Sequence, residues 1–299
     1  MNVFPQSRIA LSTGVTLNVA SAGPKDGDPI IFLHGFPESH RTWRYQFDAL
    51  STTHHCLAPD QRGFAKSDKP EGVENYAPQK MIADVLALAD AFGIDTFTLA
   101  GHDWGGAIAW GTALGHPDRV KRLIIANAPH PLLFQKALIE DRDQRIASAY
   151  IREFRKPENN AFVEENGLAA FLLKTMNWKR SPALEDAERD IMLEDWARPG
   201  AAVAMLNWYR GSPMVVPEAD EEVEPPAFLD APFPRLAMPV LVTWGMQDHA
   251  LLPGQIEGLD EIVDDLTLVE IDADHFVPWV APDAVTAAIR DWLPTRPVA

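Results

Sequence analysis

The sequence predicts one α/β domain built on a mainly parallel β-sheet, with a helical cap inserted between two of its strands. Short apolar runs rich in β-formers alternate with longer helical patterns, which is typical of a parallel sheet covered by helices on both faces. This alternation stops after Pro131 and resumes near residue 239. A chain of 299 residues is long enough for such a domain with its insertion, although length alone also allows two small domains.

The elements of the first part follow one another in a regular order. Two runs near the N-terminus, RIALS and TLNVAS, predict a hairpin. Apolar runs predict buried strands at residues 29–35, 54–60, 96–101 and 122–128. Two helices are predicted between them, one over 78–93 that ends at the plausible C-cap Gly93 and one over 104–117 whose small residues can lie close to a sheet.

The later part of the chain carries the insertion and the end of the sheet. Up to about Pro226 we find helical patterns and no convincing buried strand. Two strands are then predicted at 239–245 and 266–273, and a helix at 281–293. We therefore expect a core formed by residues 1–130 and 229–299 and a cap formed by residues 131–228.

Composition and charge exclude several classes of function. The net charge of −17 would repel nucleic acid and anionic membranes, and it argues mildly against an anionic substrate. No apolar stretch approaches the roughly 20 residues that span a bilayer, and the N-terminus does not resemble a signal peptide. The single cysteine, Cys56, is expected to be a buried strand residue and fits a reducing compartment. We expect a cytoplasmic protein with a solvated acidic loop at 217–226.

The stretch Gly101-His102-Asp103-Trp104-Gly105 has the spacing of G-x-S-x-G, but with aspartate in place of serine. That motif holds a nucleophile on a sharp turn between a strand and a helix, and here a predicted strand precedes it and a helix follows. The alternative is a tight turn in which Asp103 only caps the helix. A nucleophile at this point needs two backbone N–H donors for an oxyanion, and we expect them from Phe36, in the loop HGFPE, and from Trp104.

Two later positions can supply the partners of such a nucleophile, because the acid and then the histidine follow it along the chain in this motif's fold. Asp248 comes just after one predicted strand and His275 just after the next. The rival position for the acid holds Asn127, which has no charge to offer. No cluster has metal-ligand spacing and no glycine turn has the setting of a phosphate loop, so we expect neither a metal nor a cofactor.

These stretches resemble the epoxide hydrolases of the α/β-hydrolase superfamily. The resemblance rests on HGFPESHRTWRYQ, GHDWGG, HPDRV and the late Asp248 and His275, and it covers about residues 8 to 293. It implies the α/β-hydrolase fold with an eight-stranded sheet and a cis peptide bond before Pro37. It also implies that Asp103 is the nucleophile, Asp248 the acid and His275 the base. The related haloalkane and haloacetate dehalogenases share the aspartate nucleophile.

The chemistry explains why an aspartate would occupy the turn. An ionised carboxylate can attack an sp³ carbon without the help of a base and form an alkyl ester. The histidine is then free to deprotonate the water that attacks the ester carbonyl. An acyl substrate would not need this arrangement, whereas an epoxide or an alkyl halide does.

The leaving group separates these two substrates. An opened epoxide leaves as an alkoxide that needs a proton, and epoxide hydrolases supply it from two cap tyrosines. Tyr209 in LNWYR and Tyr150 in YIREFRKP resemble those two motifs, although spacing alone would favour tyrosines that pack on a cap helix with the hydroxyl in water. The expected partners are a small apolar epoxide and water, and the expected state is a monomer or a homodimer. Substrate contacts are expected from Trp104, Phe36, Phe154 and Phe276.

A dehalogenase is the alternative. Trp104 could donate to a halide, but Phe36 stands where haloalkane dehalogenases often carry Asn, and Trp104 stands where haloacetate enzymes carry a carboxylate-binding arginine. The His-Trp pair of the fluoroacetate enzymes' cap has no match near SAYIREF. A third possibility is a receptor of hydrolase fold that binds a small apolar ligand without turnover, and the intact nucleophile, acid, base and tyrosines argue against it.

Overall fold

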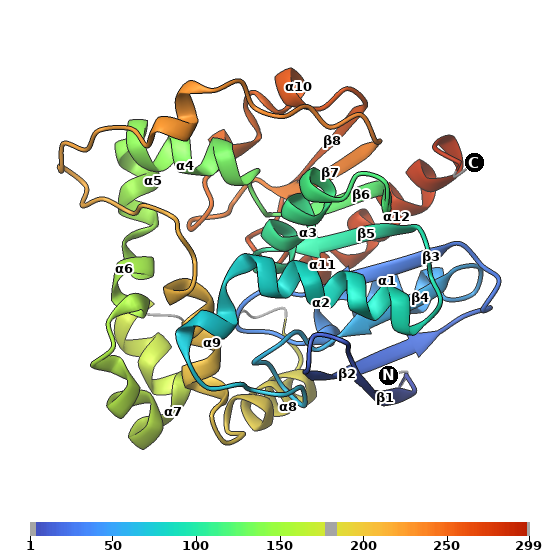
Figure 1. Ribbon diagram of the computed structural model, residues 1–299, viewed down its shortest axis with the longest axis horizontal. Coiled ribbons are helices and arrows are strands. Elements are labelled where there is room, and N and C mark those ends of the chain that lie inside the picture. Colours follow the sequence, from blue (N-terminus) through green and yellow to red (C-terminus); the bar gives the residue numbers. More distant parts are fainter. Residues whose placement is uncertain (1–3, 177–183, 298–299) are drawn as a thin grey trace.

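The computed structural model describes residues 4–176 and 184–297, and its centre is an eight-stranded sheet with the order β1-β2-β4-β3-β5-β6-β7-β8 (Figure 1). β2 pairs antiparallel with β1 and β4, and the pairs from β4 to β8 are parallel. The predicted fold class and the expected strand number are confirmed. The strands are β1 (Gln6–Ala10), β2 (Thr16–Ala22), β3 (Pro29–Leu33), β4 (His55–Pro59), β5 (Phe97–His102), β6 (Val120–Ala126), β7 (Val240–Gly245) and β8 (Leu266–Ile271).

The sheet separates two apolar cores, because successive side chains of a strand point to opposite faces. In β3, Ile31 and Leu33 belong to one core, and Ile30 and Phe32 belong to the other. Burial on both faces explains why these strands are continuous apolar runs in the sequence. The fully buried Cys56 of β4 fits its prediction as a strand residue.

Helices cover both faces of the sheet. In Figure 1, α2 and α3 lie in front of the strands, and their buried residues join the first core. Buried residues of α1, α11 and α12 join the second core. The bounds are α1 (Arg44–Leu50), α2 (Pro78–Ala91), α3 (Trp104–Gly115), α11 (Val277–Val280) and α12 (Pro282–Trp292).

The chain between β6 and β7 forms a helical insertion, which gathers on the left side of the molecule in Figure 1. Its helices are α4 (Pro131–Glu140), α5 (Arg142–Ala147), α6 (Ala149–Arg155), α7 (Asn159–Met176), α8 (Asp186–Trp196) and α9 (Ala201–Arg210). The short helix η3 (Ala227–Asp230) also lies between β6 and β7. Short helices elsewhere are η1 (His40–Trp43), η2 (Val73–Tyr76), η4 (Pro253–Ile256), α10 (Leu259–Ile262) and η5 (Leu293–Thr295). Throughout the described ranges, every helix is too short or too polar to cross a membrane.

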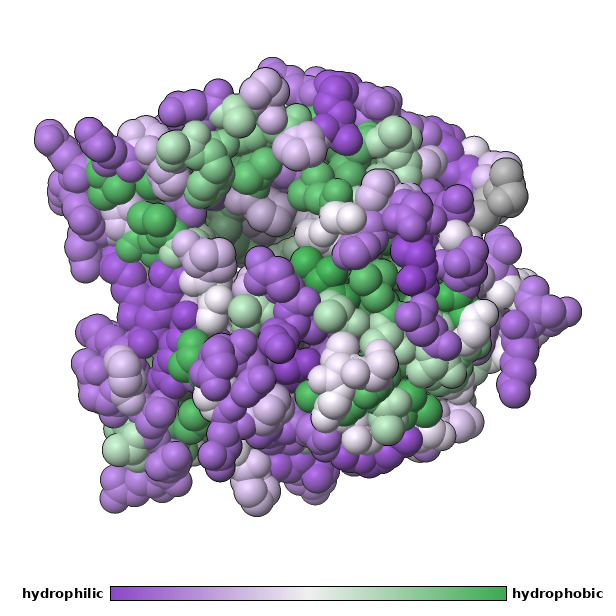
Figure 2. Space-filling model, viewed as in Figure 1, coloured by the Kyte–Doolittle hydropathy of each residue, from purple (hydrophilic) through white to green (hydrophobic). Residues whose placement is uncertain are grey.

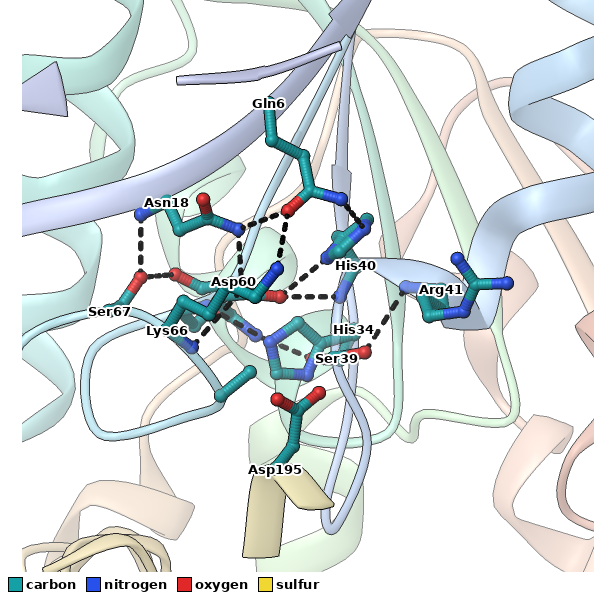
Figure 3. Close-up of polar contacts among 12 residues, drawn as sticks. Gln6, Asn18, His34, Ser39, His40, Arg41, Asp60, Lys66, Ser67 and Asp195 are labelled. Atoms are coloured by element: carbon teal, nitrogen blue, oxygen red, sulfur yellow. Dashed lines mark hydrogen bonds and ion pairs between the residues drawn. The ribbon is translucent and has the colours of Figure 1, made fainter. Parts of the chain in front are cut away.

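A polar cluster around Asp60 lies inside the core (Figure 3). The buried carboxylate of Asp60 accepts hydrogen bonds from Nδ1 of His40 at 2.7 Å and from Nδ2 of Asn18 at 2.8 Å. The backbone N–H groups of His40 and Lys66 also donate to it, at 3.1 and 3.4 Å. Burial acts to raise the pKa of Asp60, but His40, and after it the nearby His34, hold it well below its usual range. The cluster joins β2, the end of β4 and η1 around the loop that follows β3.

Candidate active site

Asp103 lies on a sharp turn between β5 and α3, as the motif predicts. Its backbone adopts φ 50° and ψ −123°, a region that residues other than glycine rarely occupy. Such strain is maintained only where the surroundings enforce it, and it is typical of functional turns. The turn directs the carboxylate into a cavity beneath the insertion, so Asp103 does more than cap a helix.

Glycines allow the loop after β3 to lie directly against this turn. A Cβ atom on Gly35 would overlap the side chain of Asp103, and one on Gly105 would overlap the carbonyl oxygens of Leu33 and His34. The buried ring of His34 fixes the same loop, since its Nε2 accepts the N–H of Gln61 at 2.9 Å and its Nδ1 lies 2.8 Å from the carbonyl of Gly35. His34 and Gly35 thus have a structural role, because they fix the loop that lies against the turn.

The loop places one of the two expected oxyanion donors. The N–H of Phe36 donates to Oδ1 of Asp103 at 2.7 Å. Trp104 is the first residue of α3, so its N–H is one of the N-terminal donors that have no partner within the helix. The peptide bond between Phe36 and Pro37 is cis, which confirms the expectation from the resemblance.

His275 and Asp248 meet Asp103 at the carboxyl ends of the strands. Nδ1 of His275 lies 2.6 Å from Oδ2 of Asp248, and Nε2 of His275 lies 3.6 Å from Oδ2 of Asp103. Asp248 Oδ1 also accepts the N–H groups of Ala250 and Leu251, at 2.8 and 2.9 Å. The three residues that the sequence singled out therefore form one chain of contacts, nucleophile to histidine to acid.

The contacts among Asp103, His275 and Asp248 shift the pKa of each residue. Burial favours the neutral imidazole, but the carboxylates of Asp248 and Asp103 outweigh it and raise the pKa of His275 well above its ordinary value. Burial likewise acts to raise the pKa of each carboxyl, and the contacts with His275 lower both. The directions of the three shifts favour an arrangement in which two carboxylates lie on either side of a protonated imidazole.

Asn127 supports the acid instead of replacing it. Its Nδ2 donates to Oδ2 of Asp248 at 2.8 Å, and its Oδ1 accepts the N–H of Gly245 at 2.7 Å. The sequence analysis considered Asn127 only as a rival position for the acid. The structure shows instead an amide that orients the acid, because β6 and β7 end side by side.

Glu38 and His102 form a second buried acid–histidine contact behind the site, which the sequence analysis did not identify. Oε2 of Glu38 lies 3.2 Å from Nδ1 of His102, and Nε2 of His102 lies 2.9 Å from the carbonyl oxygen of His275. Oε1 of Glu38 accepts the indole N–H of Trp279 at 2.6 Å. Glu38 thereby ties the loop after β3 to the backbone at His275.

A cavity of about 400 Å³ opens from Asp103 toward the insertion. Apart from Asp103 and the tyrosines, its walls are mainly apolar and come from α2, α3, α4 and the segment after α9, with Ile82, Ile108, Leu132, Phe134 and Met214 among them. Figure 2 shows apolar side chains gathered around a hollow on this face, over α3 and α4. A neutral, apolar molecule fits such walls because no polar partner is needed for most of its surface.

Tyr150 of α6 and Tyr209 of α9 both line this cavity together with Asp103. Their ring centroids are 6.1 Å apart and the rings meet edge to face. Burial, with the nearby negative charge of Asp103, raises the pKa of both phenols, so both hydroxyls stay protonated. Tyr209 is buried, at 3% exposed, which disfavours a hydroxyl in bulk water, whereas Tyr150 is half-buried at the wall of the cavity.

Of the four residues expected to contact substrate, Trp104 is part of the cavity lining, and Phe36, Phe154 and Phe276 are not. The ring of Phe36 packs against Phe154 and Tyr209, with centroids 5.4 and 5.2 Å away, and Phe154 is fully buried behind the tyrosines. The ring of Phe276 lies against His275, 5.0 Å between centroids. In the described ranges, no three His, Cys, Asp or Glu side chains come together in a way that could hold a metal ion.

Comparisons with known proteins agree with this geometry. The model of the α/β-hydrolase fold family matches residues 28–172. An AB hydrolase superfamily protein of Bacillus subtilis, YfhM, is 34% identical over 94% of this chain and 96% of its own length.

Two solved structures are similar over nearly the whole chain. One, from work on novel epoxide hydrolases of hot-environment metagenomes, is 51% identical with a TM-score of 0.92 over 97% of this chain and 99% of its own. An epoxide hydrolase of Bacillus megaterium in complex with an inhibitor is 28% identical with a TM-score of 0.83, over 96% of this chain and 100% of its own.

Proposed function

This chain belongs to the α/β-hydrolase superfamily and is an epoxide hydrolase, and we propose that it acts through a covalent ester on Asp103. One observation carries the proposal. The carboxylate of Asp103 lies between a backbone donor and a histidine on one side, and an apolar cavity with two protonated tyrosines on the other. A nucleophile, its base and a proton source thus surround the space that a small apolar epoxide would occupy.

Ring opening uses Asp103 and the tyrosines. Oδ1 is held by the N–H of Phe36, so Oδ2 attacks a ring carbon and the C–O bond of the epoxide breaks. The electron pair goes to the epoxide oxygen, which takes a proton from Tyr150 or Tyr209. The product of this step is a hydroxyalkyl ester of Asp103.

Ester formation changes the histidine. It removes the negative charge of Asp103, one of the two carboxylates that raise the pKa of His275. The proton on His275 is then held less tightly, and its release supplies the proton that returns to the tyrosinate left by ring opening. His275 becomes a neutral base, still oriented by Asp248 through a 2.6 Å contact.

Hydrolysis of the ester completes the cycle. Nε2 of His275 takes a proton from water, and the water oxygen bonds to the carboxyl carbon of Asp103. The negative charge that develops on Oδ1 is stabilised by the N–H groups of Phe36 and Trp104. Collapse releases the diol, whose oxygen takes the proton from His275, and Asp103 retains an oxygen from water as a carboxylic acid. The carboxyl proton then passes to His275, which restores the carboxylate and the protonated imidazole. One epoxide and one water thus become one vicinal diol.

A single turnover in water enriched in oxygen-18 tests the covalent step. With enzyme in excess over a neutral aryl epoxide such as styrene oxide, the first diol should carry unlabelled oxygen from Asp103. The peptide that contains Asp103 should gain the label, as mass spectrometry can detect. Label in the first diol and none in the peptide would mean that water attacks the epoxide directly.

A further inference from the structure

We propose that Trp196, at the end of α8 in the insertion, is a positioning residue for the oxyanion donor Phe36. The inference rests on the proposed function, since it concerns the donor that stabilises hydrolysis of the Asp103 ester. Trp196 does not touch the reacting atoms. It acts through the loop formed by residues 35–38, on which Phe36 is carried.

The contact is short and buried. The indole Nε1 of Trp196 donates to the carbonyl oxygen of Pro37 at 2.6 Å, and the side chain is 6% exposed. Pro37 directly follows Phe36, whose N–H donates to Asp103 Oδ1 at 2.7 Å. The indole therefore fixes the residue next to the one whose N–H must point at the oxyanion.

A second contact from α8 holds the chain just beyond this loop. Glu188 forms a buried ion pair with Arg41 of η1, in which Arg41 Nε lies 2.6 Å from Oε2. Figure 3 shows the neighbouring Asp195 pointing from α8 toward His34 and Ser39, beneath the same loop. One helix of the insertion thus contacts the loop region at both of the helix's ends.

The core holds the loop from the opposite side. Glu38 accepts the indole N–H of Trp279 and lies against His102, as described above. Two contacts therefore hold the chain directly after Phe36, one from the insertion at Pro37 and one from the core at Glu38. Oxyanion donors act because they are fixed before charge develops, so a loop released on one side stabilises that charge less well.

The effect should fall on one chemical step. Ring opening turns the carboxylate of Asp103 into a neutral ester, and negative charge on Oδ1 appears again only in the tetrahedral intermediate of ester hydrolysis. A displaced Phe36 N–H should therefore slow hydrolysis more than ring opening. If Trp196 only stabilised the fold, its replacement would lower stability and leave the ratio of the rates of ring opening and ester hydrolysis unchanged.

Trp292 offers a control for the loss of a buried indole hydrogen bond. Its indole Nε1 donates to Oγ1 of Thr267 at 3.1 Å, and it is 5% exposed, close to the value of Trp196. Trp292 of α12 and Thr267 of β8 lie outside the loop formed by residues 35–38 and outside the cavity lining. Trp196→Phe and Trp292→Phe each keep an aromatic ring and remove one buried indole hydrogen bond, so their cost in stability should be similar.

Rapid-quench kinetics with styrene oxide measure ester formation and ester decay in the three proteins. We expect ester decay to slow about tenfold in Trp196→Phe, less than the ~10²–10³ for complete loss of a donor. Ring opening should stay within about twofold in that variant, and Trp292→Phe should keep both rates. Equal slowing in the two variants, or unchanged decay in Trp196→Phe, would overturn the inference.

The wild-type trace separates this inference from the proposed function. If the single-turnover diol of the wild type carries oxygen-18 from water and Asp103 gains none, the covalent mechanism is wrong and the role of Trp196 is lost with it. If the wild type shows the ester and Trp196→Phe decays normally, only the role of Trp196 is wrong. Should Trp196→Phe fail to fold, 3-benzothienylalanine at position 196 keeps the shape of the ring and replaces the indole N–H with sulfur. It should slow the same step, and normal ester decay in that protein would overturn the inference.

Discussion

The molecule contains two buried aspartate–histidine pairs of nearly the same geometry. Oδ2 of Asp248 lies 2.6 Å from Nδ1 of His275, and Oδ1 of Asp60 lies 2.7 Å from Nδ1 of His40. Both carboxylates accept further hydrogen bonds from an asparagine side chain and from backbone N–H groups. In both, the contacts with histidine hold the pKa of the carboxyl below its usual value.

The pairs differ in what lies beyond the imidazole. Nε2 of His275 faces Asp103 at 3.6 Å, next to the cavity, whereas Nε2 of His40 lies 3.4 Å from the side-chain nitrogen of Gln6 in a closed polar cluster (Figure 3). An aspartate–histidine pair is therefore a common way to satisfy buried polar groups. It becomes catalytic only when the second ring nitrogen meets a nucleophile and space for a substrate.

The largest expected effect on turnover comes from replacing His275, the histidine of the pair next to the cavity. His275→Gln keeps Asp103 as an unaided nucleophile but removes the base, so the variant should react once and retain the ester. Turnover should fall about 10²–10⁴-fold, the usual contribution of a general base. Intact mass spectrometry should show an adduct equal in mass to the whole epoxide.

His40→Gln is the counterpart of that variant. We expect near-normal turnover from its folded fraction and a free energy of unfolding lower by about 1–3 kcal/mol, because Asp60 loses a buried donor. The comparison would fail if the two variants lost activity to the same extent, or if folded His275→Gln gave no adduct.

Replacing the two cavity tyrosines tests the contribution of the cavity that lies next to His275 and Asp103. Tyr150→Phe with Tyr209→Phe removes both proton donors and keeps the rings, so ring opening should slow by roughly 10²-fold or more. Tyr76→Phe is the control, since its hydroxyl is also buried but donates to the carbonyl of Pro70 at 2.9 Å, outside the cavity. Stopped-flow or rapid-quench kinetics measure the rate of ring opening. If the double variant opened epoxides at the wild-type rate, the assignment of the two tyrosines as proton donors would be wrong.

The smallest effect on activity is expected at Asp60, where the change should appear in stability. Because the pKa of Asp60 is lower in the folded protein, its charged form stabilises the fold above the unfolded pKa of about 3.9. That contribution is lost as the pH falls through the folded value. The wild type should thus exceed Asp60→Asn by about 1–3 kcal/mol at pH 7 and by progressively less below about pH 4.

Urea denaturation across this pH range measures the difference. Turnover at neutral pH by the folded fraction of Asp60→Asn should remain close to that of the wild type. A gap in stability that grows toward acid would contradict the sign of the pKa shift, and a large loss of turnover would contradict the separation of the two pairs.

The sequence by itself determined the fold class and the catalytic chain. Strand ends are encoded locally, by an apolar run followed by a turn, and parallel strands end at the same edge of the sheet. Asp103, Asp248 and His275 each follow such a run, so the pattern alone brought them together. The resemblance added the tyrosines and the cis peptide bond, which no local pattern would have indicated.

The tertiary structure alone decided how these groups are held and what surrounds them. The hydrogen bond from Trp196 to Pro37 joins residues 159 positions apart, and the cavity wall combines segments before α4 and after α9. Asn127 and Glu38 gain their roles only because neighbouring strands and loops meet. Such contacts depend on how the insertion packs on the core, and that packing is specified by shape and hydrogen-bond partners over the whole interface, which periodicity and spacing do not record.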